Sequence, residues 1–257
     1  MFHFIPSFTF LGFSIGGLYV YSWGLMASLG VSLALWLGYR KKIALEKESQ
    51  SFKFPDNSFW NFAILLVLAT FLGARVSYIL ETWNFYLKNP IEAFKLWEGG
   101  FSFFGGAALA IIFGFIWSKI KKQDFLMLGA IFTPAWLFGL FFGRIGCFLI
   151  HDHLGNPTNL PWGIFLEGAY RHEPALYEAV LVLILALGLH FWNKRRPLEK
   201  NIFPISLIFY SLIRFWLDFL RAGASVGGDD RFGNLTVAQW FCVLIFVLSL
   251  MIIKRKK

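Results

Sequence analysis

Residues 124–150, DFLMLGAIFTPAWLFGLFFGRIGCFLI, form an apolar segment of membrane-spanning length, and residues 151–164, HDHLGNPTNLPWGI, follow it as a turn-rich loop. An α-helix needs about 20 mostly apolar residues to cross about 30 Å of hydrocarbon. This segment carries Arg144 near its end, and His151, Asp152 and His153 follow it directly. A charge within a span costs roughly 2.5–3.5 kcal/mol on insertion scales, so Arg144 indicates a functional site.

The composition of the whole chain agrees with a membrane protein. Of its 257 residues, 57% are hydrophobic, 20% aromatic and 15% charged, and the mean hydropathy is +0.60. These values favour an all-α, polytopic membrane protein with one domain over residues 1–257. The net charge of +9 comes from short basic clusters between apolar runs. Membrane topology explains such clusters better than binding to nucleic acid.

The amino-terminal residues MFHFIPSFTFLGF lack a basic n-region and a small-residue cleavage site, so we expect the first span to be retained. Both cysteines, Cys147 and Cys242, lie in predicted spans. Neither a disulfide framework nor a zinc site is therefore indicated, and we expect no metal and no cofactor.

Seven spans are predicted, near residues 17–38, 59–81, 101–118, 124–150, 175–193, 202–220 and 236–253. Sixteen of the 24 basic residues lie in four segments on one side of these spans, namely 40–53, 119–122, 194–200 and 254–257. The other side holds five: Lys88, Lys95, Arg171, Arg221 and Arg231. The positive-inside rule then places the amino terminus outside and the carboxyl terminus in the cytoplasm. The outer segments are 82–100, which includes an amphipathic stretch suited to the membrane interface, and 151–174.

The remaining basic residues, Arg75, Arg144 and Arg214, lie inside predicted spans. Three buried guanidinium groups predict a cavity for an anion, and lipid phosphate is the most abundant anion at that depth. We expect a phospholipid head group, rather than a neighbouring carboxylate, to neutralise them. Gly143 and Gly146 flank Arg144 and suit either a bulky ligand or close helix packing.

The sixth span contains YSLIRFWLDFLR, which places Tyr210, Arg214, Asp218 and Arg221 at spacings of four, four and three residues. Such spacings put all of them on one helix face. One alternative is a polar stripe in which Asp218 pairs with Arg214 or Arg221. Because a single aspartate cannot neutralise two arginines, a positive face remains for a phosphate.

Other polar residues in the spans leave two interpretations open. Arg75 either belongs to the anion site or pairs with Glu178 of the fifth span or another acid. His151, Asp152 and His153 do not share a helix face, which argues against a metal site, and they suit head-group contacts, helix capping or proton acceptance. The segment WEGGFSFFGGAALA, residues 97–110, has paired glycines that suit either a thin cavity wall or a tight helix contact, namely Gly99, Gly100, Gly105 and Gly106.

Seven motifs, in order along the chain, resemble those of the prolipoprotein diacylglyceryl transferases of the bacterial inner membrane. They are SWGLM, GARVSY, WEGGFSFFGG, GRIGCF with LGNPTNLPWGI, RHEPALYEA, FYSLIRFWLDFLR and VAQW. The resemblance implies a multi-pass protein with seven helices and an outward amino terminus, in agreement with the charge pattern.

The resemblance also implies a reaction. The family transfers the diacylglyceryl group of phosphatidylglycerol to the lipobox cysteine of a prolipoprotein, forming a thioether and releasing glycerol phosphate. The implied partners are phosphatidylglycerol, a prolipoprotein signal peptide and membrane lipids. By position, Arg144 matches the lipid-binding arginine, while Tyr210 and Arg214 match a catalytic pair.

The candidate residues follow from both lines of argument. Asp152 matches the acidic residue of the family signature and Gly155 matches its last glycine, while Asp218 and Arg221 continue the face of Arg214. The candidate catalytic residues are Arg144, His151, Asp152, Tyr210 and Arg214. The candidate substrate-binding residues are Arg144, Arg75, Gly105, Gly106, Gly155, Glu178, Asp218 and Arg221.

Three positions depart from the family pattern: Phe104 stands where many members have a histidine, Trp23 where many have a tyrosine, and Cys147 where many have an asparagine. We expect the thiol proton to be removed by another group, with His151 or His153 available. The alternatives are a catalytically divergent homologue and an anion- or lipid-binding membrane transporter. Many transporters are built from repeated halves, and no repeat is evident here.

Overall fold

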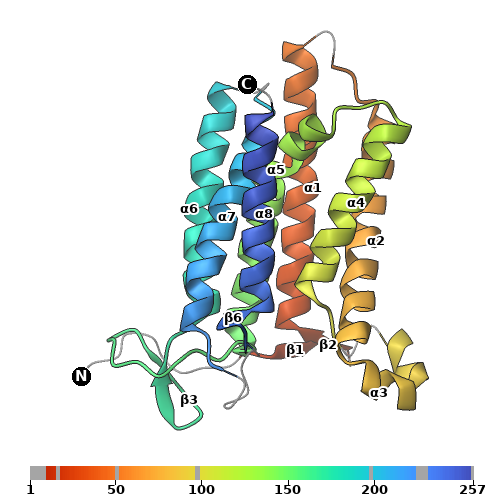
Figure 1. Cartoon of the computed structure of the whole chain (residues 1–257). Coiled ribbons are helices and arrows are strands. Elements are labelled where there is room, and N and C mark those ends of the chain that lie inside the picture. The colour runs from red at the N-terminus through yellow and green to blue at the C-terminus, as the bar shows by residue number, and fades with distance from the viewer. Residues whose placement is uncertain are drawn as a thin grey trace. The chain divides into compact units, whose positions relative to one another are not determined.

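A computed structural model describes residues 10–15, 18–49, 52–95, 99–196, 199–223 and 231–255 (Figure 1). Within these ranges, seven helices are long and apolar enough to cross a membrane, which confirms the predicted spans. They are α1 (Ser22–Glu48), α2 (Asp56–Glu81), α4 (Phe103–Ile120), α5 (Phe125–Ile150), α6 (Pro174–Arg195), α7 (Ile202–Leu217), which continues as the 3₁₀ turn η3 (Asp218–Leu220), and α8 (Val237–Lys254).

The first span differs from its prediction at both ends. Strand β2 (Leu18–Tyr21) pairs antiparallel with β1 (Gly12–Ile15), so α1 begins at Ser22 rather than near residue 17. The Ser22 N–H is held by the Leu11 carbonyl at 2.9 Å. At its other end α1 continues to Glu48, because the strong helix formers in RKKIALEKE extend it beyond the apolar part.

The chain divides into two compact units, a smaller unit of residues 45–128 and a larger unit of residues 1–44 and 129–257. The single domain expected from the sequence stays a prediction. In the smaller unit α2 and α4 lie side by side (Figure 1). A Cβ atom at Gly105 would lie 2.1 Å from Ser77 Cβ, and one at Gly106 would lie 3.0 Å from the Thr70 carbonyl. The tight helix contact, one of the two open interpretations, therefore accounts for both glycines.

The segment after α2, which the charge pattern predicts to lie outside, contains two short helices, α3 (Trp83–Lys88) and the 3₁₀ helix η1 (Pro90–Phe94). Tyr86 is buried, whereas Ile91 and Phe94 are 74% and 80% exposed. This distribution agrees with an amphipathic piece, and its place at the membrane interface stays a prediction.

In the larger unit, α7 packs against α6 and α8 (Figure 1). In the most apolar 18-residue window of α5, 50% is buried, compared with 22% in the corresponding window of α8. The core is formed by apolar side chains of α5, α6 and α7, namely Ala130, Leu137, Val182, Ala186, Leu189, Ile202 and Tyr210.

The loop that follows α5 is tied into a small β structure. Strands β3 (Ile164–Leu166) and β4 (Ala169–Arg171) form a hairpin. Asn156 links this hairpin to the end of η3. Its N–H donates to the carbonyl of Leu220, the last residue of η3, at 2.8 Å, and its carbonyl accepts from the N–H of His172, the residue after β4, at 2.9 Å. The sequence predicted turns here but not this pairing, which brings the 151–155 segment beside Arg221.

Gly155 is required by that close approach. A Cβ atom at this position would lie 2.1 Å from the His172 carbonyl oxygen. The backbone of His172 thus occupies the space beside Gly155, so packing, rather than contact with a substrate, accounts for the glycine. Strands β5 (Arg231–Phe232) and β6 (Leu235–Thr236) form a hairpin that leads into α8.

Candidate active site

A buried carboxylate, Glu178 of α6, lies at the centre of the larger unit's polar interior. It is fully buried. Its Oε2 accepts a hydrogen bond from Arg214 Nη1 at 2.9 Å, and its Oε1 accepts one from the Tyr210 hydroxyl at 3.0 Å. Arg144 Nε lies 3.0 Å from Oε1. One acid thus holds residues from α5 and α7.

A second buried acid, Asp218, lies at the end of α7. Its Oδ1 is 2.8 Å from Arg214 Nη2 and 3.6 Å from Arg221 Nη1. The sequence left open that Asp218 pairs with Arg214 or Arg221. In the structure Asp218 contacts both arginines. These contacts bring Arg214, Asp218 and Arg221 together, but Arg221 lies beyond η3 with an extended backbone, so the predicted helix face does not include it.

The expectation that a lipid head group alone neutralises the arginines is wrong. Arg144 and Arg214 both contact Glu178, and Arg214 and Arg221 both contact Asp218. Isolated charges are too costly to bury, and paired acids lower that cost. Two carboxylates thus serve three guanidinium groups in these ion pairs, and the carboxylate of Asp152 also faces Arg144 and Arg221.

Arg144 keeps an unsatisfied donor. Its side chain is 8% exposed, and its Nε has no hydrogen-bond partner among the described residues, because the N–H is not aligned with the Glu178 oxygen beside it. A buried donor without an acceptor is costly, and a bound anion would supply one. Arg144 is therefore the arginine best prepared for a ligand.

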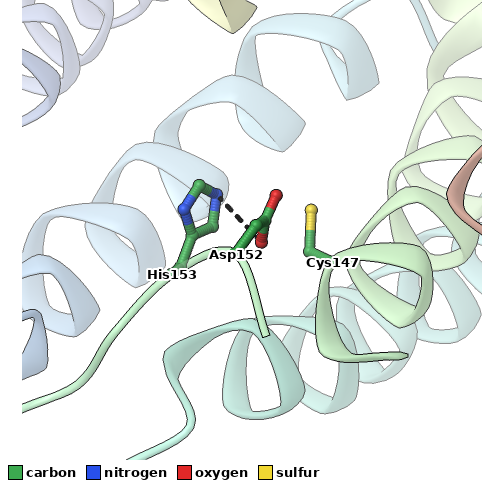
Figure 2. A group of neighbouring side chains, drawn as sticks. All are labelled: Cys147, Asp152 and His153. Atoms are coloured by element: carbon green, nitrogen blue, oxygen red, sulfur yellow. Dashed lines mark ion pairs between the residues drawn. The ribbon is translucent and has the colours of Figure 1, made fainter. Parts of the chain in front are cut away.

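The last turn of α5 adds Cys147, and the loop that follows it adds Asp152 and His153 (Figure 2). The donor atoms of these three side chains lie within 4.8 Å of one another, and Asp152 Oδ1 is 3.8 Å from His153 Nε2. The sequence spacing did not predict that Cys147 would join them. The turn at His151, with a left-handed φ of 52°, folds Asp152 back towards Cys147.

Cysteine, carboxylate and imidazole are ligand types for zinc, but the hydrogen bonding of His153 argues against a metal. Arg221 Nη2 lies 3.0 Å from His153 Nδ1. A guanidinium can only donate, so Nδ1 accepts, and in the neutral ring Nε2 then carries the proton. That tautomer offers Nε2 as a donor towards Asp152, so we assign no metal to these residues.

The same contact removes His153 as a proton acceptor. Burial, followed by the positive charges of Arg221 and Arg144, lowers its pKa to about 2. Its free lone pair already accepts from Arg221. Of the two histidines considered from the sequence, His153 therefore cannot take a proton near neutral pH.

His151 has a different partner that sequence reasoning missed. Its Nδ1 lies 2.9 Å from Glu173 Oε2, and both side chains are almost fully buried. Burial raises the pKa of Glu173 to about 7, although the contact with His151 opposes that shift. Burial also raises the pKa of Asp152, which Arg144 and Arg221 oppose. His151 and Asp152 thus remain candidate proton acceptors.

Arg75, in the smaller unit, is satisfied by backbone carbonyls. Its Nε donates to Ala93 at 3.0 Å, its Nη1 donates to Gly99 at 2.6 Å and Gly100 at 3.1 Å, and its Nη2 donates to Glu92 at 2.7 Å and Lys95 at 3.4 Å. Five donor hydrogens meet five acceptors, so no donor is left for a phosphate. Arg75 thus holds the backbone of residues 92, 93, 95, 99 and 100, which argues against a substrate contact, while its pairing with Glu178 stays a prediction.

A profile of the prolipoprotein diacylglyceryl transferase family matches residues 11–255. The chain belongs to this family. It is 33% identical over 222 residues to the phosphatidylglycerol–prolipoprotein diacylglyceryl transferase of Mannheimia succiniciproducens, which covers 84% of this chain and 81% of that protein. Enzymes of the same name from Finegoldia magna (30% identity, 96% of both chains) and Campylobacter hominis (33% identity, 96% of this chain and 89% of that protein) are similar over nearly their full length.

Membership of the prolipoprotein diacylglyceryl transferase family confirms the resemblance drawn from the seven motifs and makes this chain a multi-pass membrane transferase. The two family arginines, Arg144 and Arg214, meet at one acid. Their roles and those of Tyr210, Asp152 and His151 remain hypotheses about this member.

Proposed function

We propose that this protein transfers the diacylglyceryl group of phosphatidylglycerol to the lipobox cysteine thiol of bacterial prolipoproteins. The observation that carries the proposal is the buried group of Arg144, Glu178 and Arg214, in which two guanidinium groups share one carboxylate inside a membrane protein of this family. A phosphodiester supplies the negative charge and the acceptor oxygens that guanidinium groups bind. The names of the relatives supply phosphatidylglycerol and prolipoprotein as substrates.

The transfer breaks one bond and forms another. The substrate sulfur attacks the glyceride carbon that carries the phosphate, the C–O bond breaks, and glycerol phosphate leaves with an additional negative charge. Arg144 and Arg214 stabilise that charge, since guanidinium groups in a buried site act strongly on developing negative charge. Tyr210 donates to Glu178 and so orients the acid between the arginines.

The thiol proton needs an acceptor because Phe104 stands at the position of the family histidine. The Nδ1 atom of His153 already accepts a hydrogen bond from Arg221, so it is not available for the proton. Asp152 lies close to Cys147 and Arg144, and His151 lies against Glu173. Either residue can take the proton, and nearby positive charge assists by lowering the pKa of an incoming thiol.

We further propose that the protein lies in the bacterial inner membrane with its amino terminus outside. The charge count supports this orientation, because sixteen basic residues fall on one side and five on the other. The site residues at the end of α5, and the loop that follows it, then lie towards the outer leaflet.

The test is transfer by purified protein in lipid nanodiscs that contain phosphatidylglycerol, with a lipobox peptide as acceptor. Mass spectrometry should detect a thioether adduct with the wild type, none with Arg144→Ala, and none when the peptide cysteine is serine. Arg195→Ala, which removes an exposed arginine on α6, is the matched control and should retain activity.

Two results would contradict the proposal. The absence of an adduct from the wild type would exclude transfer, and retention of phosphatidylglycerol without an adduct would favour a lipid-binding or transport protein. Equal adduct from wild type and Arg144→Ala would remove Arg144 from the site.

A further inference from the structure

The amino end of α8 is closed by a reciprocal cap. Thr236 Oγ1 accepts a hydrogen bond from the Gln239 N–H at 3.1 Å, and Gln239 Oε1 accepts one from the Thr236 N–H at 3.0 Å. Thr236 is 2% exposed and Gln239 is fully buried. A capping box satisfies two backbone donors at the start of its helix. This one faces the interior.

The hydroxyl of Thr236 has a second partner. While its oxygen accepts from Gln239, its hydrogen is donated to Asp218 Oδ2. The other oxygen of Asp218 contacts Arg214 Nη2 at 2.8 Å and Arg221 Nη1 at 3.6 Å. The cap therefore fixes one side of the carboxylate whose other side meets two arginines of the proposed site.

Gln239 makes a parallel connection. Its Nε2 donates to the carbonyl of Phe215 at 3.0 Å, and Phe215 is the residue after Arg214. This carbonyl lies in the last α-helical turn of α7, before the chain tightens into η3, where carbonyls lose regular helical donors. Gln239 thus holds the backbone next to Arg214, while Thr236 holds the acid that faces its side chain.

The position of α8 also affects the charge. The amino end of a helix carries a partial positive charge of roughly +0.5, which stabilises a nearby carboxylate. Asp218 lies against that end through Thr236. The positive end of α8 thus lies beside the same carboxylate that Arg214 and Arg221 contact.

We infer that Thr236 and Gln239 are positioning residues for the reaction, holding Asp218 and the last turn of α7 so that the Arg214 guanidinium is set between Glu178 and Asp218. The inference rests on the proposed function, because it assigns these residues to the orientation of a phosphate-binding arginine. It explains why a buried helix cap shares its hydroxyl with an acid of the site.

The experiment compares Thr236→Val, which keeps the shape but removes the hydroxyl, with Thr236→Ser, which restores it. Steady-state transfer in nanodiscs gives kcat and KM for phosphatidylglycerol. Thr236→Val should lower kcat/KM by between about 10- and 100-fold, as expected for a small misplacement of a reacting group. Thr236→Ser should recover most of that loss.

Asp124→Ala is the matched control. Asp124 caps the start of α5, where its Oδ1 accepts from the Leu126 N–H at 2.9 Å and the Met127 N–H at 3.3 Å. Its removal should lower the melting temperature in detergent as Thr236→Val does, but should leave kcat/KM unchanged. Equal losses of kcat/KM in both variants would mean that Thr236 is only structural, and wild-type kcat/KM in Thr236→Val would overturn the inference outright.

A double-mutant cycle tests the route through Asp218. In an Asp218→Asn background, Thr236→Val should lower kcat/KM little further, because the carboxylate that Thr236 orients is gone. If the two substitutions instead lower kcat/KM independently, Thr236 does not act through Asp218. A wild type without adduct would instead refute the proposed function. In that case, native mass spectrometry can still compare how much phosphatidylglycerol stays bound to the wild type and to Thr236→Val. Equal amounts would exclude a role of Thr236 in positioning Arg214.

Discussion

The buried Glu178 carboxylate of α6 lies 3.0 Å from Arg144 Nε of α5. The same carboxylate accepts from Arg214 on α7. One acid therefore sets the separation of two arginines on different helices.

Replacing Glu178 by glutamine should abolish transfer and lower the melting temperature. The two arginines would lose their shared counter-ion, and breaking a buried ion pair from one side costs about 3–5 kcal/mol. Glu92→Gln is the control, because its ion pair with Lys95 is partly exposed and such pairs contribute about 0–1 kcal/mol. Unchanged melting and activity in Glu178→Gln would refute the central role of this acid.

Arg144→Lys separates charge from geometry. Lysine keeps the positive charge but loses the planar set of donors that binds a phosphate at two points. We expect transfer to fall by about 10- to 100-fold, corresponding to about 1.4–2.7 kcal/mol of transition-state stabilisation, whereas we expect no adduct from Arg144→Ala. The rate of thioether formation measures this, and full activity in Arg144→Lys would mean that a point charge is sufficient.

The spans and the family were accessible from the sequence because apolar length, basic clusters and the order of motifs are local properties. The shared partner of Arg144 and Arg214 was not, since Glu178 lies 34 positions after Arg144 and 36 before Arg214 in the chain. The contacts of Arg75 were not accessible either, because its acceptors are backbone carbonyls, which no residue type reveals. The Thr236 cap had a readable signal, since a threonine three residues before a glutamine at the start of an apolar run indicates a capping box.

Gly100→Ala should destabilise the protein more than Gly99→Ala. Both glycines have a positive φ, 84° at Gly99 and 78° at Gly100, so each alanine incurs a backbone cost of roughly 1–2 kcal/mol. Only at Gly100 would the new Cβ meet neighbours, 2.5 Å from Tyr78 and 2.8 Å from Arg75 Nη1. Thermal unfolding in detergent compares the two variants, and equal shifts would show that the loop does not depend on its fit around Arg75.

Glu173→Gln should change the pH dependence of stability. The pKa of Glu173 is raised from 4.5 to about 7 by burial, so the folded state binds more protons than the unfolded state between these values, and stability falls as the pH rises through this window. Glutamine cannot titrate, so the variant should gain in melting temperature relative to the wild type between pH 5 and about pH 8. His153 acts in the opposite direction, because its pKa is lowered and its stabilising effect is lost as the pH falls below 6.5, but it is present in both proteins. If the difference in melting temperature between the two proteins stayed constant across this pH range, the raised pKa of Glu173 would be contradicted.

The pH profile of transfer identifies the proton acceptor. His153→Gln should leave the profile unchanged, because His153 is neutral throughout the neutral range and a glutamine oxygen can still accept from Arg221. If His151 takes the thiol proton, His151→Gln should lower the rate of transfer by about 10²- to 10⁴-fold, because general-base catalysis contributes that much. An unchanged rate in His151→Gln, together with loss of transfer in Asp152→Asn, would assign the proton to Asp152 instead. A shifted profile in His153→Gln would mean that Arg221 does not hold the Nδ1 lone pair of His153, which is the contact that excludes this histidine as a base.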